Sequence, residues 1–424
     1  MAPPLAADVG FTFADPWALG LTFLGLAVFA AIGALSHEHE RAFSASLIYL
    51  GLGVVAAVAL ALAGADWLDP LQDTSLVEHI TELAVIIALF SAGLKVDRAL
   101  RWRDWSTVTR LLAIGMPAFI VLAAAFGGLV MGLSLGAAVV LASALAPTDP
   151  VLAGDIGIGP PGEEDEQEPH FAITTEAGFN DGLAFPFVLL GLVIAEKSGV
   201  GGWLAGDVIY PILGGAALGA GLGTAIAWSI VRLRDRELLI PALDGWVGVA
   251  ATLALYGVAE TLSTYGFLAV FAGGLAFRRY EHDHEVNGRV HDGTELVEKF
   301  GELAVILLLG SMLTLEGLGA PGLAGWGLAI LVVFVLRPLT VNLALIGSRM
   351  RRPGERAFVA WFGVRGVGTL FYVSVAAAAG SPLPRDEREL IVWTAIACVV
   401  LSVIVHGITA GPLNRWLTAN VLSR

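Results

Sequence analysis

The chain has 424 residues, of which 56% are hydrophobic and 15% charged, and its mean hydropathy is +0.78. This composition excludes an ordinary soluble globular protein and is typical of a chain that lies in a lipid bilayer. The net charge of −14 argues against nucleic-acid binding, which needs a basic surface. The single cysteine, Cys398, excludes a disulfide framework within the chain.

Hydrophobic stretches long enough to span a membrane follow one another along the sequence. Taking about 20 apolar residues as one span, we expect an all-α polytopic membrane protein with about thirteen transmembrane helices. The fifth contains Pro147 and Pro150, so we expect it to be broken. No soluble C-terminal regulatory domain is expected, because the sequence ends soon after the last helix. The expected helices cover residues 17–35, 44–63, 77–95, 106–127, 129–157, 170–195, 203–230, 241–260, 263–279, 299–317, 323–347, 355–379 and 389–414.

Basic residues are distributed unevenly over the expected loops. With the N-terminus outside, the inside loops carry 19 Lys and Arg and the outside loops carry 3. Cytoplasmic loops are enriched in basic residues, so we expect the N-terminus outside and the C-terminus in the cytoplasm of a bacterial-type inner (plasma) membrane. Arg337 and Arg365 remain inside expected spans. We expect Arg337 to pair with an acid or a helix-terminal carbonyl.

A short repeat links the third and tenth expected helices. The segment ELAVI occurs at 82–86 and again at 302–306, an offset of 220. A shift of seven helices makes the two copies cross the membrane in opposite senses, which is the inverted-topology repeat of secondary transporters. The same offset pairs the broken fifth helix with the glycine-rich twelfth at 363–369. Both contain helix breakers around a polar centre, so we expect two discontinuous helices.

Polar residues in the sixth expected helix point to an ion pathway. A carboxylate in mid-membrane costs roughly 2.5–3.5 kcal/mol on insertion scales, and helices seldom retain one without a function. Asp181 is such a residue. Glu176 and Asn180 are four residues apart and share a helix face, and Asp181 lies about 100° further round.

Two further segments supply charged or cation-binding groups. Prolines beside Thr148 and Asp149 free backbone carbonyls, which are hard ligands suited to alkali cations. Asp149 is equally compatible with an N-cap for the second half of the broken helix. Arg365 lies among glycines of the twelfth helix, and a buried arginine needs a compensating acid.

These groups suggest that the carboxylates have different roles. An acid paired with arginine keeps its charge, whereas desolvation drives an unpaired acid in a narrow cavity toward its protonated form. An acid that holds either a proton or a metal cation, but never both, makes an antiporter. One free carboxylate predicts one-for-one, electroneutral exchange of a monovalent cation.

Three motifs resemble those of NhaP-type cation/proton antiporters, bacterial relatives of the animal sodium/proton exchangers. They are Thr148-Asp149-Pro150, the run from Glu176 to Gly182, and Gly363-Val364-Arg365-Gly366. The resemblance implies that Asp181 binds cation and proton, with Asn180 as its helix-face partner and Glu176 bound to Arg365. Thr148 and Asp149 would mark the crossing of the two broken helices, and Thr148 and Asp181 would contact the transported metal ion.

The resemblance also implies a domain organisation and partners. It implies a homodimer with an alternating-access core at about 77–195 and 299–415, and an interface domain at about 1–76 and 203–279. No cofactor and no nucleic-acid partner are expected; the partners are the bilayer, the cation and the proton. Ala177 departs from the family, because some relatives have a serine ligand there; water or Thr175 would have to replace it.

Three classes of function remain to be weighed. The first is exchange of Na⁺, or alternatively K⁺, for H⁺. A cation channel could use the same residues, but a carboxylate that must release one ion before binding the next favours exchange. An enzyme is not expected, because the chain lacks an HExxH helix and paired catalytic aspartates. His406 is expected to be a packing histidine.

Overall fold

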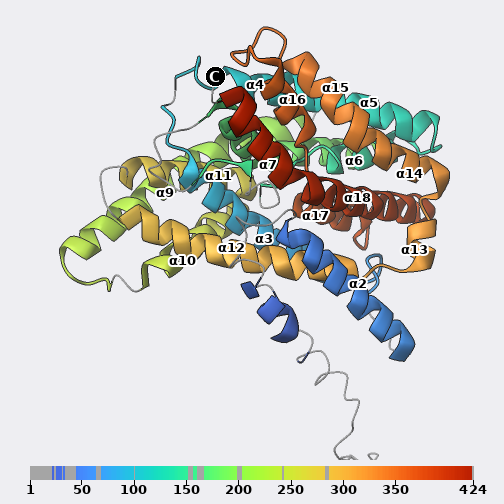
Figure 1. Cartoon of the computed structure of the whole chain (residues 1–424), viewed down its shortest axis with the longest axis horizontal. Helices are drawn as coiled ribbons and strands as arrows, with labels where there is room; N and C mark the ends of the chain where they lie inside the picture. The colour runs from blue at the N-terminus through green and yellow to red at the C-terminus, as the bar shows by residue number, and fades with distance from the viewer. Residues whose placement is uncertain are drawn as a thin grey trace, which may run out of the picture.

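The computed structural model describes residues 44–422, with gaps at 64–67, 100, 151–155, 160–166, 198–202, 241–242 and 282–285, and a few positions between 22 and 33. The described residues form helices and connecting turns and include no strand (Figure 1). The predicted all-α fold is confirmed.

Helices occupy each of the expected stretches from the second onward, and the first lies mostly outside the described residues. The first half contains α2 (Ala45–Ala63), α3 (Thr74–Lys95), α4 (Ser106–Arg110), η2 (Leu111–Gly115), α5 (Met116–Leu129), α6 (Leu135–Ala144) and α7 (Glu168–Ala195). Next come η4 (Leu204–Ile209), α9 (Tyr210–Asp235), α10 (Asp244–Thr261) and α11 (Gly266–Glu281). The last part contains α12 (Val286–Ser311), α13 (Leu315–Gly319), α14 (Gly322–Leu331), η6 (Val332–Leu336), α15 (Arg337–Ala344), α16 (Pro353–Trp361), α17 (Val367–Ala377), α18 (Arg385–Leu417) and η7 (Thr418–Leu422).

Seven helices of the described part are long and apolar enough to cross a membrane. They include α2, α3, α7 and the continuous helices made by α4 with α5 and by α14 with α15. Two shorter apolar helices, α6 and α17, belong to the stretches predicted to be broken. The full number of thirteen crossings stays a prediction.

Three π-helical segments each end just before a proline. The segments η2, η4 and η6 precede Pro117, Pro211 and Pro338. Proline has no N–H to donate to the carbonyl four residues earlier, and a widened turn is one way for a helix to pass it without ending. The helices therefore continue through these prolines: η2 and η6 join the helices on either side of them into long spans, and η4 leads directly into α9.

Glycines let the helices approach closely. On the α2–α12 contact, a Cβ built on Gly53 would stand 2.5 Å from the carbonyl oxygen of Leu307. On the α3–α11 contact, a Cβ on Gly274 would stand 2.5 Å from the carbonyl oxygen of Phe90. Lipid tails are as apolar as leucine, so helix association in a bilayer depends on such close backbone packing. This accounts structurally for many of the 52 glycines.

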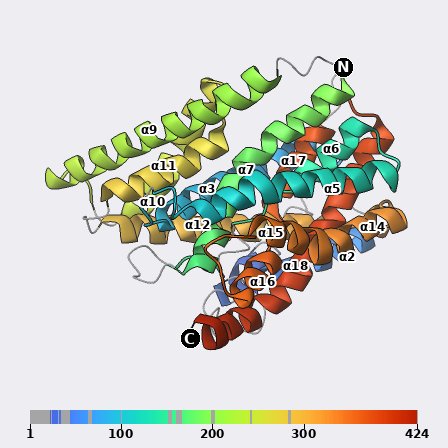
Figure 2. The same cartoon turned by 90° about the horizontal axis from the view of Figure 1, so that it is seen from above.

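The helix α7 lies in the middle of the molecule. Figure 2 shows it between α9 and α11 on one side and α16 and α18 on the other. Gly178 and Gly182, one turn apart on α7, press against Phe271 and Leu268 of α11. Asp181 is next to Gly182 on the helix, but its carboxylate meets Gly368 of α17 on another side of α7.

Candidate functional site

Two interrupted helices meet beside α7. After α6 ends, residues 145–150 are not helical, and residues 362–366 between α16 and α17 are not helical either. The backbone N–H of Asp149 donates to the carbonyl oxygen of Val364 at 2.9 Å. In return, Asp149 Oδ2 accepts from the backbone N–H of Val367 at 2.5 Å. The two predicted breaks thus lie against each other in space.

Asp149 acts as a cap across this contact. The N–H groups of the first helical turn have no partner within their own helix, and Asp149 satisfies one at the start of α17. The sequence suggested an N-cap for the second half of a broken helix. In the described residues the capped helix is α17, which follows the second break.

Arg365 is buried and forms no ion pair with any acid in the described part of the chain, which corrects the predicted pair with Glu176. Its Nε donates to the carbonyl oxygen of Leu145 at 2.6 Å, and its Nη1 donates to that of Gly363. Its backbone N–H donates to Ser402 Oγ at 2.8 Å. The carbonyls that receive the guanidinium lie at the two breaks, where unwinding leaves them without helical donors.

Glu176 instead pairs with Arg337 at the start of α15. The contact is bidentate, with Nη1–Oε1 at 2.5 Å and Nη2–Oε2 at 2.6 Å. Both side chains are buried. The expectation that Arg337 pairs with an acid is confirmed. A parallel two-bond pair of this kind is among the stronger hydrogen-bonded contacts that side chains make.

Thr148 and Asn180 bind each other directly. Asn180 Nδ2 donates to Thr148 Oγ1 at 2.8 Å, and the backbone N–H of Thr148 donates to Asn180 Oδ1 at 3.2 Å. The amide therefore holds the first break against α7. Both residues are almost completely buried.

Asp181 is a buried acid that no described neighbour neutralises. Its relative exposure is 0%, and both carboxylate oxygens lack a hydrogen-bond partner among the described residues. A Cβ built on Gly368, in the first turn of α17, would stand 2.5 Å from Asp181 Oδ1. The backbone of Gly368, which carries no side chain, therefore faces the Asp181 carboxylate from α17.

Two threonine hydroxyls near these segments are also unsatisfied. Thr175 Oγ1 on α7 and Thr369 Oγ1 on α17 are buried and have no hydrogen-bond partner in the described structure. Thr369 follows Gly368 directly. Ala177 is completely buried and provides no side-chain oxygen. The unsatisfied atoms are all oxygens, the donor type that hard cations prefer over sulfur or imidazole.

The sequence reasoning missed Gly368, Tyr372 and Ser402. The Tyr372 hydroxyl donates to the backbone carbonyl oxygen of Asp181. Gly368 and Tyr372 are four residues apart, so they share one face of α17. This spacing could have indicated from the sequence that both residues face α7. Ser402 had no such signal, because a serine in a long apolar helix is common.

Aromatic rings pack around Tyr372. Its ring stacks on Phe185 with centroids 6.0 Å apart, and it contacts Phe371 edge-on at 5.2 Å. Phe267 lies against Phe371 at 4.9 Å. Tyr372, which these rings surround, donates to the Asp181 backbone, and the zero exposure of Asp181 shows that its carboxylate is occluded.

His406 lies in a hydrogen-bonded chain that leads to the second break. Its Nδ1 lies 3.0 Å from Ser402 Oγ, and its Nε2 lies 3.1 Å from the carbonyl oxygen of Trp361, the last residue of α16. Ser402 in turn accepts from Arg365 N–H. A neutral imidazole with its proton on Nε2 satisfies every member of this chain, since Nδ1 then accepts from the serine hydroxyl.

Known proteins resemble this chain over most of its length. Residues 24–416 match the family model described as "Sodium/hydrogen exchanger, transmembrane". The chain is 26% identical to the Na(+)/H(+) antiporter 2 of Zygosaccharomyces rouxii, covering 88% of this chain and 51% of that protein. It is 25% identical to the K(+)/H(+) antiporter NhaP of Alkalimonas amylolytica, covering 81% of this chain and 58% of that protein. The chain spans about half the length of the first curated relatives that it matches.

A solved structure shares the fold. The sodium proton antiporter MjNhaP1 from Methanocaldococcus jannaschii superimposes with a TM-score of 0.73 at 19% identity, over 95% of this chain and 98% of the other. The family match extends over nearly all the described helices, including both breaks and Asp181. This multi-pass membrane chain therefore belongs to the transmembrane sodium/hydrogen exchanger family, a family of transporters rather than enzymes.

Proposed function

We propose that the protein exchanges a monovalent cation, foremost Na⁺, for H⁺, with Asp181 binding the two in turn. The main support is the buried Asp181 carboxylate, whose oxygens have no hydrogen-bond partner among the described residues. Burying a charge without a partner is unfavourable, so this group needs either a proton or a cation. Oxygen atoms of Thr148, Thr175 and Thr369 are candidates to complete the cation's shell.

The neighbouring acids support one-for-one stoichiometry. Glu176 is neutralised by Arg337, and Asp149 is engaged by the N-terminal N–H of α17. Asp181 is then the site carboxylate left to change its occupant. Exchanging one proton for one monovalent cation on a single acid moves no net charge.

Occlusion of Asp181 supports alternating access rather than a channel. A channel needs a continuous water path, whereas this carboxylate is reached from neither side. We propose that a core domain, about 77–195 and 299–415, moves against an interface domain, about 1–76 and 203–279. In this proposal the protein is a homodimer in an inner (plasma) membrane, with its N-terminus outside and its C-terminus in the cytoplasm.

The cation is proposed from the names of relatives. The relatives from Zygosaccharomyces rouxii and Halobacillus dabanensis are named Na(+)/H(+) antiporters, and the one from Alkalimonas amylolytica is named a K(+)/H(+) antiporter. Na⁺ is therefore the first ion to test and K⁺ the alternative.

Reconstituted vesicles test the proposal. With an outward proton gradient, Na⁺, K⁺ or Li⁺ added outside in turn should alkalinise the lumen, and Asp181→Asn should abolish this while the protein stays folded. Asp386→Asn, which removes an exposed acid at the start of α18, is the control and should transport normally. Normal exchange by folded Asp181→Asn protein would contradict the proposal.

A further inference from the structure

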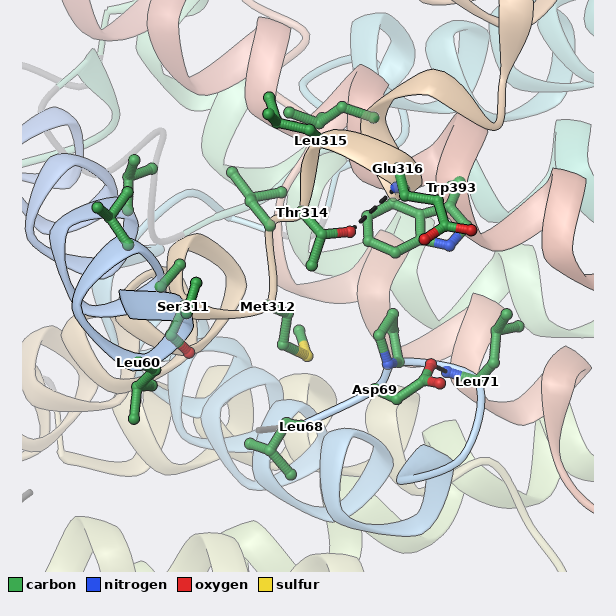
Figure 3. A pocket seen from close by; sticks show the side chains of 18 of the residues that line it. Leu60, Leu68, Asp69, Leu71, Ser311, Met312, Thr314, Leu315, Glu316 and Trp393 are labelled. Carbon is green, nitrogen blue, oxygen red and sulfur yellow. Dashed lines mark hydrogen bonds between the residues drawn. The ribbon is translucent and has the colours of Figure 1, made fainter. Parts of the chain in front are cut away.

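A large cavity lies apart from the residues of the Asp181 site. It is lined by the later part of α2, the segment before α3, the connection from α12 into α13, and the first turns of α18 (Figure 3). Its volume is about 890 Å³, within the range of sites that take organic ligands. None of the residues described at the Asp181 site lines this cavity.

One flank of the cavity is apolar and open. Val58 and Leu62 of α2 and Leu315 of α13 line it, with relative exposures of 54%, 85% and 92%. Exposed aliphatic side chains on and beside a helix that is long and apolar enough to span a membrane are suited to contact lipid tails. The flank can therefore admit an acyl chain from the bilayer.

The cavity also has a charged part. Asp69, Glu316 and Glu389 provide three carboxylates, and Arg385 provides one guanidinium. Figure 3 shows Asp69 and Glu316 on different sides of the cavity, with Glu316 beside the Trp393 ring. Asp69 Oδ1 accepts from the backbone N–H of Leu71 at 2.8 Å.

Three of these charges belong to exposed side chains. Arg385, Glu316 and Glu389 make no ion pair or hydrogen bond within the part of the chain that the structure describes, which leaves out residues 64–67. Charges of both signs in one cavity, without pairing to each other, match a ligand that carries both signs itself.

We propose that this cavity binds a phospholipid with an ethanolamine headgroup. Arg385 receives the phosphate, for which its planar fork of donors is suited, and the carboxylates receive the primary ammonium. The acyl chains lie along the α2 and α13 flank.

The headgroup decides the selectivity. Lipid tails are as apolar in the bilayer as in the cavity, so they create no preference among phospholipids. A trimethylammonium group has no N–H to donate to Glu316 or Glu389. A glycerol headgroup has no positive charge, so the lipid is a net anion. The three carboxylates of the cavity outnumber its one arginine and disfavour such a lipid.

The position of the cavity gives the lipid a structural role. The helix α12 packs on α2, α10 and α3, whereas α18 packs chiefly on α14 and α17. The cavity lies where these two sets of helices adjoin. A bound phospholipid would therefore bridge them.

Native mass spectrometry of the delipidated full chain tests the proposal. Phosphatidylethanolamine, phosphatidylcholine and phosphatidylglycerol with identical acyl chains are titrated separately. We expect one ethanolamine lipid to bind at roughly tenfold lower concentration than the other two, a difference typical of one lost charged contact. Arg385→Gln should weaken it by a similar factor, and Glu316→Gln with Glu389→Gln should remove the preference over phosphatidylcholine.

Two further variants make the result decisive. Asp386→Asn removes an acid next to Arg385 that does not line the cavity, and should bind the lipid as the unchanged protein does. Ala57→Trp fills the cavity from α2 and should abolish the tight site, with circular dichroism confirming the fold. Equal binding of all three lipids, a preference for phosphatidylglycerol, or tight binding that survives Ala57→Trp would each overturn the proposal. This readout does not depend on transport.

Discussion

The residue pair Glu176–Arg337 gives one buried acid a bidentate partner, whereas the Asp181 carboxylate has none among the described residues. Removing one partner leaves the other buried and unpaired, which costs about 3–5 kcal/mol in proteins. We expect Arg337→Gln and Glu176→Gln each to lower the thermal unfolding temperature. The double variant should lose less stability than the two single variants lose together. The coupling should be about 1–3 kcal/mol. When Glu176→Gln is combined with Arg365→Gln instead, the losses of stability should be close to additive. Strong coupling between these two substitutions would support the Glu176–Arg365 pair that the sequence suggested.

Gly368 is the residue that lets α17 reach the Asp181 carboxylate. An added Cβ would stand 2.5 Å from Oδ1, so Gly368→Ala must displace the acid, and misplacing a reacting group by about 1 Å can reduce a rate by about 100-fold. We expect exchange to fall at least about tenfold while stability does not, since alanine favours a helix over glycine by about 1 kcal/mol. Transport in vesicles and thermal unfolding measure the two effects.

A matched glycine provides the control for this variant. Gly257→Ala in α10 meets no atom within 4 Å, so it should leave transport unchanged. An equal loss of transport in Gly368→Ala and Gly257→Ala would mean that the contact between α17 and Asp181 does not matter for exchange.

At the scale of elements, α18 supports the break between α16 and α17. Ser402 accepts from Arg365 N–H, and His406 reaches the carbonyl oxygen of Trp361. The break is thus held by hydrogen bonds from both of these α18 residues. The packing role expected for His406 agrees with its burial, and its hydrogen bonds add a direct link to the break.

Ser402→Ala tests this support. It leaves a buried N–H without an acceptor, which costs about 1–3 kcal/mol, so we expect lower thermal stability and slower exchange. Thr394→Val in the same helix is the control, because Thr394 Oγ1 makes no hydrogen bond among the described residues. If both substitutions destabilise equally, α18 contributes packing alone.

At the scale of the whole molecule, the proposed exchange requires that Asp181 open to one side of the membrane at a time. A proton and a cation that share one acid compete, so acidifying the cation side should raise the cation concentration for half-maximal exchange. In the acid limit the rise should approach about tenfold per pH unit, with the maximal rate unchanged. Initial rates in vesicles over a pH series measure this. A falling maximal rate at constant half-saturation would indicate separate proton and cation sites.

Much of the site was predictable from the sequence, because its residues come in short motifs. Thr148, Asp149, Asn180 and Asp181 were expected together, and the structure brings their segments into contact. The partner of Glu176 was not predictable. Arg337 and Arg365 both lie in glycine- or proline-interrupted spans, and the sequence gives neither the depth nor the facing direction of a helix.

The sequence by itself determined the membrane class, the helical stretches, the two breaks and the identity of the unusual acid, because hydrophobicity and helix breakers act locally along the chain. Only the tertiary structure decided which charges neutralise each other, since carbonyls freed at both breaks can satisfy Arg365 and release Glu176 to Arg337. The tertiary structure likewise decided that α17 begins against Asp181, and it formed the cavity between α2, α13 and α18. These features depend on distances between segments far apart in the chain, which helix packing fixes and local sequence does not.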